Sequence, residues 1–191
     1  MGIVWLKKAG GLFPDVPYGS NLNLDQMKRR APTAKVYGSG WLPDHQLVMR
    51  GVPGRSYLDV IPAPSSKVPV GCFCMEDCDL ASLDEYEGYP DLYTRKAIEL
   101  PIQKPDGSVS RINCFYYQMV TDDGLAPCTD FYFEECLQGY QDFDFDQTYL
   151  VNAYWQARHS DQQELKLLKE CILAMKEKEE QATDLKSDHH S

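Results

Sequence analysis

Histidine and positive charge are scarce in this sequence, and long apolar runs are missing. The 191 residues include four histidines, 19 basic and 29 acidic residues, for a formal net charge of -10. Nucleic-acid phosphates and anionic membrane surfaces need a basic partner, so this balance argues against both. No stretch is long and apolar enough to span a bilayer, and at the start Lys7 and Lys8 follow a short apolar run, the reverse of a secretory signal. We therefore expect a cytoplasmic protein with no nucleic-acid and no membrane partner.

The familiar catalytic motifs are also missing. The sequence contains no P-loop, no dinucleotide-binding glycine fingerprint and no zinc-protease helix. A serine nucleophile would need a strand-to-helix elbow and a partner histidine. In the part that we expect to fold, the histidines are His45 and His159, and neither belongs to a recognisable motif. These observations argue against histidine-based catalysis.

Seven cysteines are present, without regular spacing. An odd, irregular set fits reduced thiols better than a disulfide framework. Cys72, Cys74 and Cys78 invite a metal interpretation, but no histidine and no second cysteine pair accompany them. We favour Cys72 and Cys74 as small buried groups on one face of a strand, and we expect no metal site.

The residues that are present predict a single α+β domain. Apolar residues make up 43% of the chain, enough for a core. β-rich runs and turn residues predict strands separated by turns. We expect one strand to end at Pro62 and a pair of strands to form around the turn Leu42-Pro43-Asp44. The predicted strands are Ala34–Trp41, His45–Arg50, Tyr57–Ile61, Val68–Met75, Tyr93–Ile102 and Arg111–Val120, with a tight turn at residues 105–108.

Three helices are expected among and after these strands. Leu24–Arg30 has an asparagine cap at Asn21 or Asn23 and ends before Pro32; Leu80–Tyr86 and Phe131–Tyr140 are the others. Hairpins outnumber βαβ units, which favours a small mixed, mainly antiparallel sheet, closed into a β-barrel with flanking helices.

The composition changes near Ser160. We expect a domain over residues 1–159, a C-terminal helix over 160–180 beginning with a capping box at Ser160 and Gln163, and a disordered polar tail over 181–191 that includes His189 and His190. Apolar residues form a seam along this helix. A helix packed on the domain is the favoured interpretation, and a homodimer through the helix stays open as the alternative. The seam consists of Leu165, Leu168, Ile172 and Met175.

Two short segments could carry chemistry. In Tyr18-Gly19-Ser20-Asn21-Leu22, the glycine permits close approach of a ligand, and backbone N–H groups at a helix start can hold an anion or a carbonyl oxygen. Taken alone, such a segment is more often a plain turn.

The second segment runs from Leu83 to Pro90. Glu87 is placed at a helix end, before Gly88 and between tyrosines, where partial desolvation would raise the pKa of its carboxyl group. Taken alone, a solvated acidic cluster is the commoner interpretation.

In combination, the two segments resemble the γ-glutamylcyclotransferase family. The family pattern continues with Ala126-Pro127, Tyr132 and Gly139, and the resemblance covers Tyr18 to about Asp146. It implies an enzyme that cyclises the γ-glutamyl group of a small-molecule substrate to 5-oxoproline and releases an amino acid or amine. It also implies that no cofactor is needed. The form Tyr-Gly-Ser-Asn resembles the general branch, since the glutathione-specific branch usually has Tyr-Gly-Ser-Leu and the γ-glutamylamine branch Tyr-Gly-Thr-Leu.

The resemblance also implies roles for particular residues. Glu87 matches the catalytic glutamate, which acts as general base and then as general acid. The amides of Gly19 to Leu22 would either stabilise the developing oxyanion or bind the α-carboxylate of the substrate, and both roles stay open. The implied substrate-binding residues are Tyr18, Gly19, Ser20, Asn21, Leu22, Tyr93 and Tyr132.

Two further interpretations stay open. Pro14 and Pro17 stand where the family has an apolar strand leading into the loop, which suggests a non-catalytic member that binds a small ligand or a partner protein. The second is an assembly module that pairs two chains through the apolar seam.

Overall fold

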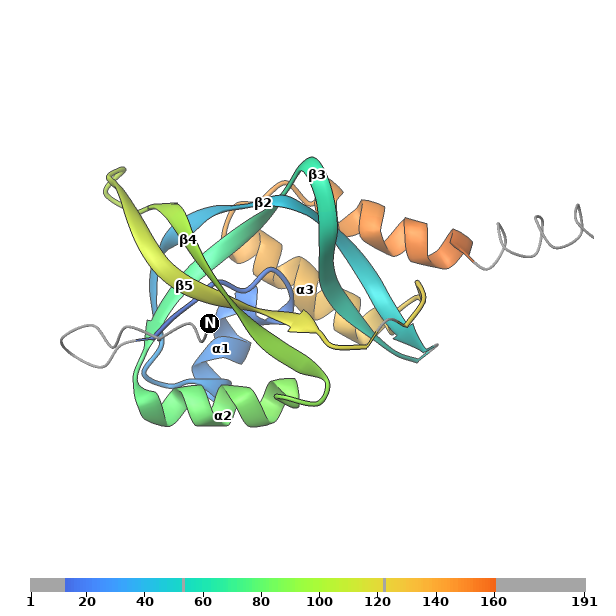
Figure 1. The fold of residues 1–191 in the computed structure, drawn as a ribbon, viewed down its shortest axis with the longest axis horizontal. Helices are drawn as coiled ribbons and strands as arrows, with labels where there is room; N and C mark the ends of the chain where they lie inside the picture. The colour runs from blue at the N-terminus through green and yellow to red at the C-terminus, as the bar shows by residue number, and fades with distance from the viewer. Residues whose placement is uncertain (1–12, 53, 122, 161–191) are drawn as a thin grey trace, which may run out of the picture.

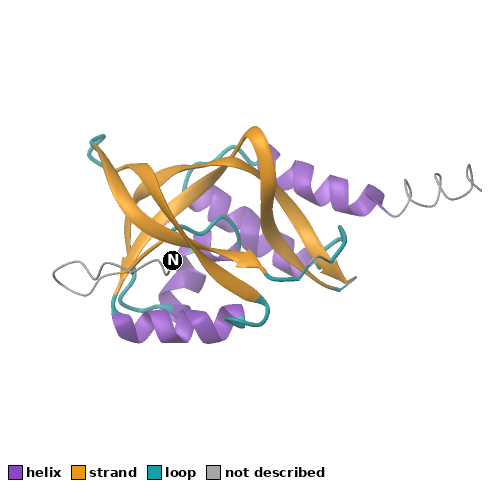
Figure 2. Ribbon diagram, in the orientation of Figure 1, coloured by secondary structure: helices purple, strands orange, loops and turns teal. Residues whose placement is uncertain are grey.

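The computed structural model describes residues 13–160, except positions 53 and 122, and shows a ring of five strands with helices around it (Figures 1 and 2). The ring has the order β1-β3-β2-β4-β5. Neighbouring strands are antiparallel except β1 and β5, which are parallel. The predicted α+β class and the mixed, mainly antiparallel sheet are confirmed. The strands are β1 (Phe13–Asp15), β2 (Lys35–Val52), β3 (Arg55–Met75), β4 (Tyr93–Gln103) and β5 (Val109–Met119).

The prediction of short strands before Met75 was wrong. β2 and β3 each run as one long strand and pair along almost their whole length, from Lys35 opposite Cys74 to Val52 opposite Arg55. Leu42-Pro43-Asp44 is therefore no hairpin turn. Asp44 has a positive φ of 55° at a register shift between Pro43 and His45, so a bulge absorbs the turn-like residues while the ladder continues.

Pro62 does not end a strand either. It pairs opposite His45, directly beside that register shift. Proline is tolerated in a strand at a bulge, where one ladder hydrogen bond is already missing.

The second hairpin agrees with its prediction. β4 and β5 pair from Tyr93 opposite Met119 to Gln103 opposite Val109. The turn between them is closed by Lys104 and Ser108, and Gly107 within it has a φ of 83°.

The first three helical segments contain or adjoin the segment Tyr18-Gly19-Ser20-Asn21-Leu22, called the early loop from here on, and Glu87. A 3-10 turn, η1 (Ser20–Leu22), leads into α1 (Leu24–Arg30), which has the predicted bounds. The side chain of Asn23 caps α1 by accepting from the N–H of Gln26. α2 (Asp77–Glu87) begins earlier than predicted, and Figure 1 shows it beside α1 at one end of the ring.

The C-terminal part of the described chain is also helical. α3 (Asp130–Asp142) is capped by Thr129 and contains the predicted segment. Residues 148–160 form a further helix that was not predicted. Ser160, the last described residue, belongs to this helix, and its hydroxyl donates to the carbonyl of Ala157 at 2.8 Å. Gln163 of the predicted capping box and the rest of the predicted helix at 160–180 lie outside the described residues. The predicted seam from Leu165 to Met175, a homodimer through it, and the tail at 181–191 lie outside the described residues.

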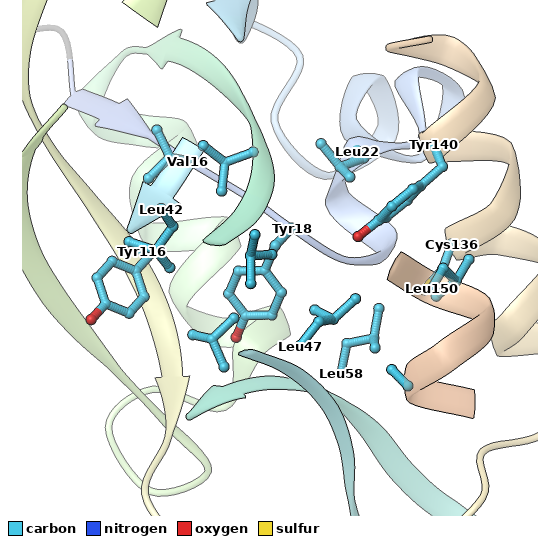
Figure 3. Close-up of a cluster of buried hydrophobic side chains, with 14 of the residues drawn as sticks. Val16, Tyr18, Leu22, Leu42, Leu47, Leu58, Tyr116, Cys136, Tyr140 and Leu150 are labelled. Atoms are coloured by element: carbon cyan, nitrogen blue, oxygen red, sulfur yellow. The ribbon is translucent and has the colours of Figure 1, made fainter. Parts of the chain in front are cut away.

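The main core fills the ring and continues to the C-terminal helices. Figure 3 shows the phenol ring of Tyr140 between Leu22 of η1 and Leu150. This packing joins the early loop to the end of the described chain. A second, smaller core lies under α1 and α2 and includes Met27, Leu83 and Phe115. In the part of the chain that the structure describes, no helix is long and apolar enough to cross a membrane.

Candidate active site

The early loop is held between β3 and α3. The carbonyl of Pro17 accepts from the N–H of Gly71 at 3.1 Å, and the N–H of Leu22 donates to the carbonyl of Gly19 at 2.9 Å. A methyl group at Gly139 of α3 would lie 2.6 Å from the nitrogen of Asn23, so only glycine lets the helix approach this closely. The loop is therefore fixed by its surroundings.

Glu87 is the last residue of α2. Gly88 adopts the left-handed conformation (φ 65°, ψ 34°) and donates to the carbonyls of Asp84 and Glu85 at the end of the helix. The chain reverses there, and Tyr93 then begins β4. This agrees with the predicted helix end, and the reversal turns Glu87 toward the early loop.

One hydrogen bond joins the two segments. Nδ2 of Asn21 donates to Oε1 of Glu87 at 2.6 Å. On the other side of the same amide, Nη1 of Arg30 donates to Oδ1 of Asn21 at 2.5 Å. The guanidinium fixes which way the amide faces, because Oδ1 must point to Arg30 and Nδ2 is then free to donate to the carboxylate.

Burial raises the pKa of Glu87 to about 7, although the hydrogen bond from Asn21 and the positive charge of Arg30 both lower it. The negative charge of Asp84 raises it further. A carboxyl group with this pKa is divided between its two protonation states near neutral pH. It can therefore accept a proton and return it.

A cavity of about 40 Å³ lies between the two segments. Gly19 marks its wall: a methyl group built there would lie 3.4 Å from the hydroxyl oxygen of Tyr132 and from Leu58. Among the described residues, the N–H groups of Gly19, Ser20 and Asn21 donate to no acceptor, whereas the N–H of Leu22 donates to the carbonyl of Gly19. The lining residues are Pro17, Tyr18, Gly19, Ser20, Asn21, Leu58, Glu87, Tyr93, Tyr117 and Tyr132.

The three predicted tyrosines differ in what they can still donate. The hydroxyl of Tyr18 donates to the carbonyl of Tyr117 at 2.6 Å, and that of Tyr93 donates to the carbonyl of Leu58 at 2.8 Å. Each hydroxyl has one proton, so both are already committed. The hydroxyl of Tyr132 accepts from the N–H of Leu58 at 3.1 Å, which leaves its own proton for another acceptor.

The structure brings most of the predicted site residues together. Those that line the cavity are Tyr18, Gly19, Ser20, Asn21, Glu87, Tyr93 and Tyr132. Leu22 does not reach it. Its side chain is fully buried in the core beside Tyr140, and it supports the loop from behind (Figure 3).

Several neighbours of the site were missed. Arg30 ends α1, and nothing in its local sequence signals a role. Leu58 and Tyr117 come from β3 and β5, and their positions depend on strand register. Tyr117 donates to Oδ1 of Asp84 at 2.7 Å and so links β5 to α2. The two tyrosines beside Glu87 in the sequence were the only local hint of an aromatic surrounding.

The described residues form no cluster of metal-ligating side chains. Within residues 13–160, apart from the two omitted positions, no group of three or more histidine, cysteine, aspartate or glutamate side chains is placed to hold a metal ion. Cys72 is buried, Cys74 is half-buried, and Cys78 is exposed.

Comparison with known proteins identifies the family. Residues 17–133 match the family described as "Gamma-glutamyl cyclotransferase, AIG2-like", so the chain belongs to that family. The match spans the early loop, Glu87 and Tyr132. A comparison with curated proteins found no match.

Solved structures show the same fold. A structure described as "Gamma-glutamyl cyclotransferase" aligns with a TM-score of 0.63 and 23% identity, over 74% of this chain and 86% of that one. An uncharacterized human protein aligns with a TM-score of 0.64 and 23% identity, over 75% of this chain and 86% of that one. YkqA from Bacillus subtilis aligns with a TM-score of 0.61 and 13% identity, over 77% of this chain and 54% of that one. At these identities the likeness establishes the fold alone.

Proposed function

We propose that this protein is a γ-glutamylcyclotransferase: it cyclises the γ-glutamyl group of a small molecule to 5-oxoproline and releases an amino acid or amine. The observation that carries the proposal is the Glu87 carboxylate, which accepts from Asn21 beside the loop amides in a cavity and has a pKa near 7. The family membership supports the same reaction class.

Glu87 starts the reaction as a base. The α-amino group of the substrate is protonated near neutral pH and cannot attack until it loses a proton. With that proton on Glu87, the amine nitrogen attacks the γ-carbonyl carbon of the same molecule, and a five-membered ring forms. The early loop and tyrosines hold the flexible chain in the curled conformer, which lowers the entropic part of the barrier.

Charge develops on the γ-carbonyl oxygen during the attack. The N–H groups of Gly19, Ser20 and Asn21 either stabilise this oxygen or bind the α-carboxylate. The C–N bond to the leaving group then breaks. In all, two protons leave the attacking nitrogen and two reach the departing nitrogen, so Glu87 can return each proton it takes and ends in its starting state.

The test replaces the carboxylate. In Glu87→Gln, release of 5-oxoproline from γ-glutamyl dipeptides should fall by at least about 1,000-fold, because general acid–base catalysis and correct orientation are lost together. Glu85→Gln is the matched control. Glu85 is exposed on the same helix, so that variant should stay active. Near-normal turnover in Glu87→Gln would remove this residue from its role.

Stability separates lost chemistry from lost folding. The pKa of Glu87 is raised in the folded state, so its favourable contribution to folding is present below about pH 4.5 and is lost as the pH rises through about 7. Glutamine has no charge to desolvate. At pH 8, Glu87→Gln should therefore unfold at a higher temperature than the wild type, with an unfolding free energy greater by up to about 3 kcal/mol, and at pH 4 the two should unfold at nearly the same temperature.

A binding-only protein would behave differently. Ligand-induced stabilisation by γ-glutamyl dipeptides with no 5-oxoproline formed by the wild type would contradict the enzymatic proposal and favour a non-catalytic member of the fold.

A further inference from the structure

The cavity at Glu87 adjoins a second, wider compartment of about 190 Å³. The two share Ser20, Glu87, Tyr93 and Tyr132. The residues that belong to the second compartment alone are Tyr57, Tyr86 and Leu92, whose exposed fractions are 36%, 49% and 37%. In contrast, Tyr18, Leu58 and Tyr117 of the first cavity are 6% exposed or less. The second compartment is therefore the outer one, and Glu87 stands at the junction.

This geometry places the two halves of a substrate, if the proposed function holds. Glu87 must reach both the attacking and the departing nitrogen, so the scissile bond lies at the junction. Gly19 and Asn21, whose N–H groups donate to no acceptor among the described residues, line the inner cavity alone, so we assign the glutamyl half to that cavity. The group that departs must extend into the outer compartment.

The walls of the outer compartment are aromatic and apolar. Tyr57 packs edge-on against Tyr132, with ring centroids 5.3 Å apart. Tyr86 and Leu92 come from the end of α2 and the segment after it, and Tyr93 completes the wall. Such surfaces favour a planar ring or a bulky apolar side chain.

Charge in the outer compartment disfavours ionic side chains. Among its described lining residues, Glu87 is the only one with a charge, and it repels an acidic side chain. The guanidinium of Arg30 lies 3.5 Å from the ring centroid of Tyr86 and also contacts its hydroxyl. Glu87 would attract a basic side chain, but the guanidinium of Arg30 would repel it and already occupies one face of the Tyr86 ring.

We propose that the outer compartment is a leaving-group subsite for aromatic or bulky apolar residues, formed by Tyr57, Tyr86 and Leu92. The substrates are then γ-glutamyl compounds whose released part has a large uncharged side chain. This inference rests on the proposed function and adds a substrate class to it.

Binding and turnover are measured separately. Dissociation constants are determined by calorimetry on the full-length Glu87→Gln protein, and 5-oxoproline release on the wild type. The probes are γ-glutamyl-phenylalanine, γ-glutamyl-alanine, γ-glutamyl-glutamate and γ-glutamyl-lysine. Aromatic contacts should favour γ-glutamyl-phenylalanine over γ-glutamyl-alanine by about tenfold, and the two charged dipeptides should bind no better than γ-glutamyl-alanine.

Two variants test the residues independently. Leu92→Ala and Tyr57→Leu should each reduce the phenylalanine-to-alanine ratio by at least about threefold. Leu24→Ala is the matched control. Leu24 is 40% exposed, like Leu92, but it lies on α1 and does not line either compartment, so the ratio should be unchanged.

The outcomes separate this inference from the proposed function. Turnover of γ-glutamyl-alanine without any aromatic preference would overturn the subsite and leave the enzyme assignment standing. Aromatic preference in binding that is lost in both variants, with no turnover by the wild type, would support the subsite and contradict the enzyme assignment. Failure of every dipeptide to bind would overturn both.

Discussion

At the scale of single residues, the site depends on one amide held between opposite charges. Asn21 accepts from Arg30 through Oδ1 and donates to Glu87 through Nδ2. Arg30 thus acts on Glu87 in two ways: its charge lowers the pKa of the carboxyl group, and its hydrogen bond orients the amide that lowers it further. We regard Arg30 as a positioning residue.

Removing this charge should shift the pH dependence of catalysis. In Arg30→Met, the pKa of Glu87 should rise above about 7, so less of the required carboxylate is present at neutral pH. The midpoint of the rising limb of kcat/KM against pH should move upward by about one unit, and activity should be recovered at higher pH. Arg29→Met, on an exposed position of the same helix, should leave the midpoint in place. A lower rate with an unshifted midpoint would show that Arg30 has only a structural role.

The sequence predicted the residues with local signals and missed those without. Glu87 and the early loop were recognised because together they resemble the γ-glutamylcyclotransferase motifs, although each segment taken alone had a commoner interpretation. Arg30 reaches Asn21 from the far end of the adjacent helix α1, and Leu58 reaches the site from the distant strand β3. Leu22 was grouped with the site because it belongs to the motif Tyr18-Gly19-Ser20-Asn21-Leu22, although its side chain faces the core.

At the scale of elements, the position of the loop depends on how closely α3 approaches it. Gly139 faces η1, and a methyl group there would lie 2.6 Å from both the nitrogen of Asn23 and the Cβ of Leu22. These are a backbone atom and the base of a buried side chain, so neither can move aside without moving η1. The packing of α3 therefore sets the place of the Asn21 amide.

Gly139→Ala should push η1 away from α3. We expect a loss of about 1–3 kcal/mol in unfolding free energy and a raised KM for γ-glutamyl dipeptides, because the loop amides move from the glutamyl half of the substrate. Gly124→Ala is a suitable control, since nothing lies within 4 Å of a methyl group there. Equal melting temperatures for Gly139→Ala and the wild type would contradict the close packing.

Local pattern predicted some elements well and others poorly. α1 and the β4–β5 hairpin were predicted because a cap and a tight turn define them. The long strands β2 and β3 were divided at prolines, since a sequence pattern does not show that a bulge at Asp44 lets the ladder continue. The helix at residues 148–160 was missed, although Asp146 caps its start by accepting from the N–H of Thr148 at 2.9 Å.

At the scale of the whole molecule, the ring of strands closes through its shortest ladder, the one between β1 and β5. Within the described residues, β1 has three residues and shares one partner pair with β5, Asp15 opposite Phe115. Pro14 has no N–H to contribute. Among the described residues, neither carboxylate oxygen of the buried Asp15 has a hydrogen-bond partner outside its own strand, and burial raises the pKa of this group well above its usual range. The early loop follows this strand directly.

Hydrogen–deuterium exchange should therefore be uneven around the ring. The amide of Val16, which donates to Phe115 at 2.9 Å, should exchange at least about tenfold faster than the amides paired between β4 and β5, because opening one short strand costs less than global unfolding. Uniform protection around the ring would contradict this. Saturating γ-glutamyl-alanine should slow the exchange at Val16, since a ligand that binds only the closed form reduces opening. A bound substrate would then also hold the ring closed, because it would stabilise the contact between the first strand and the last.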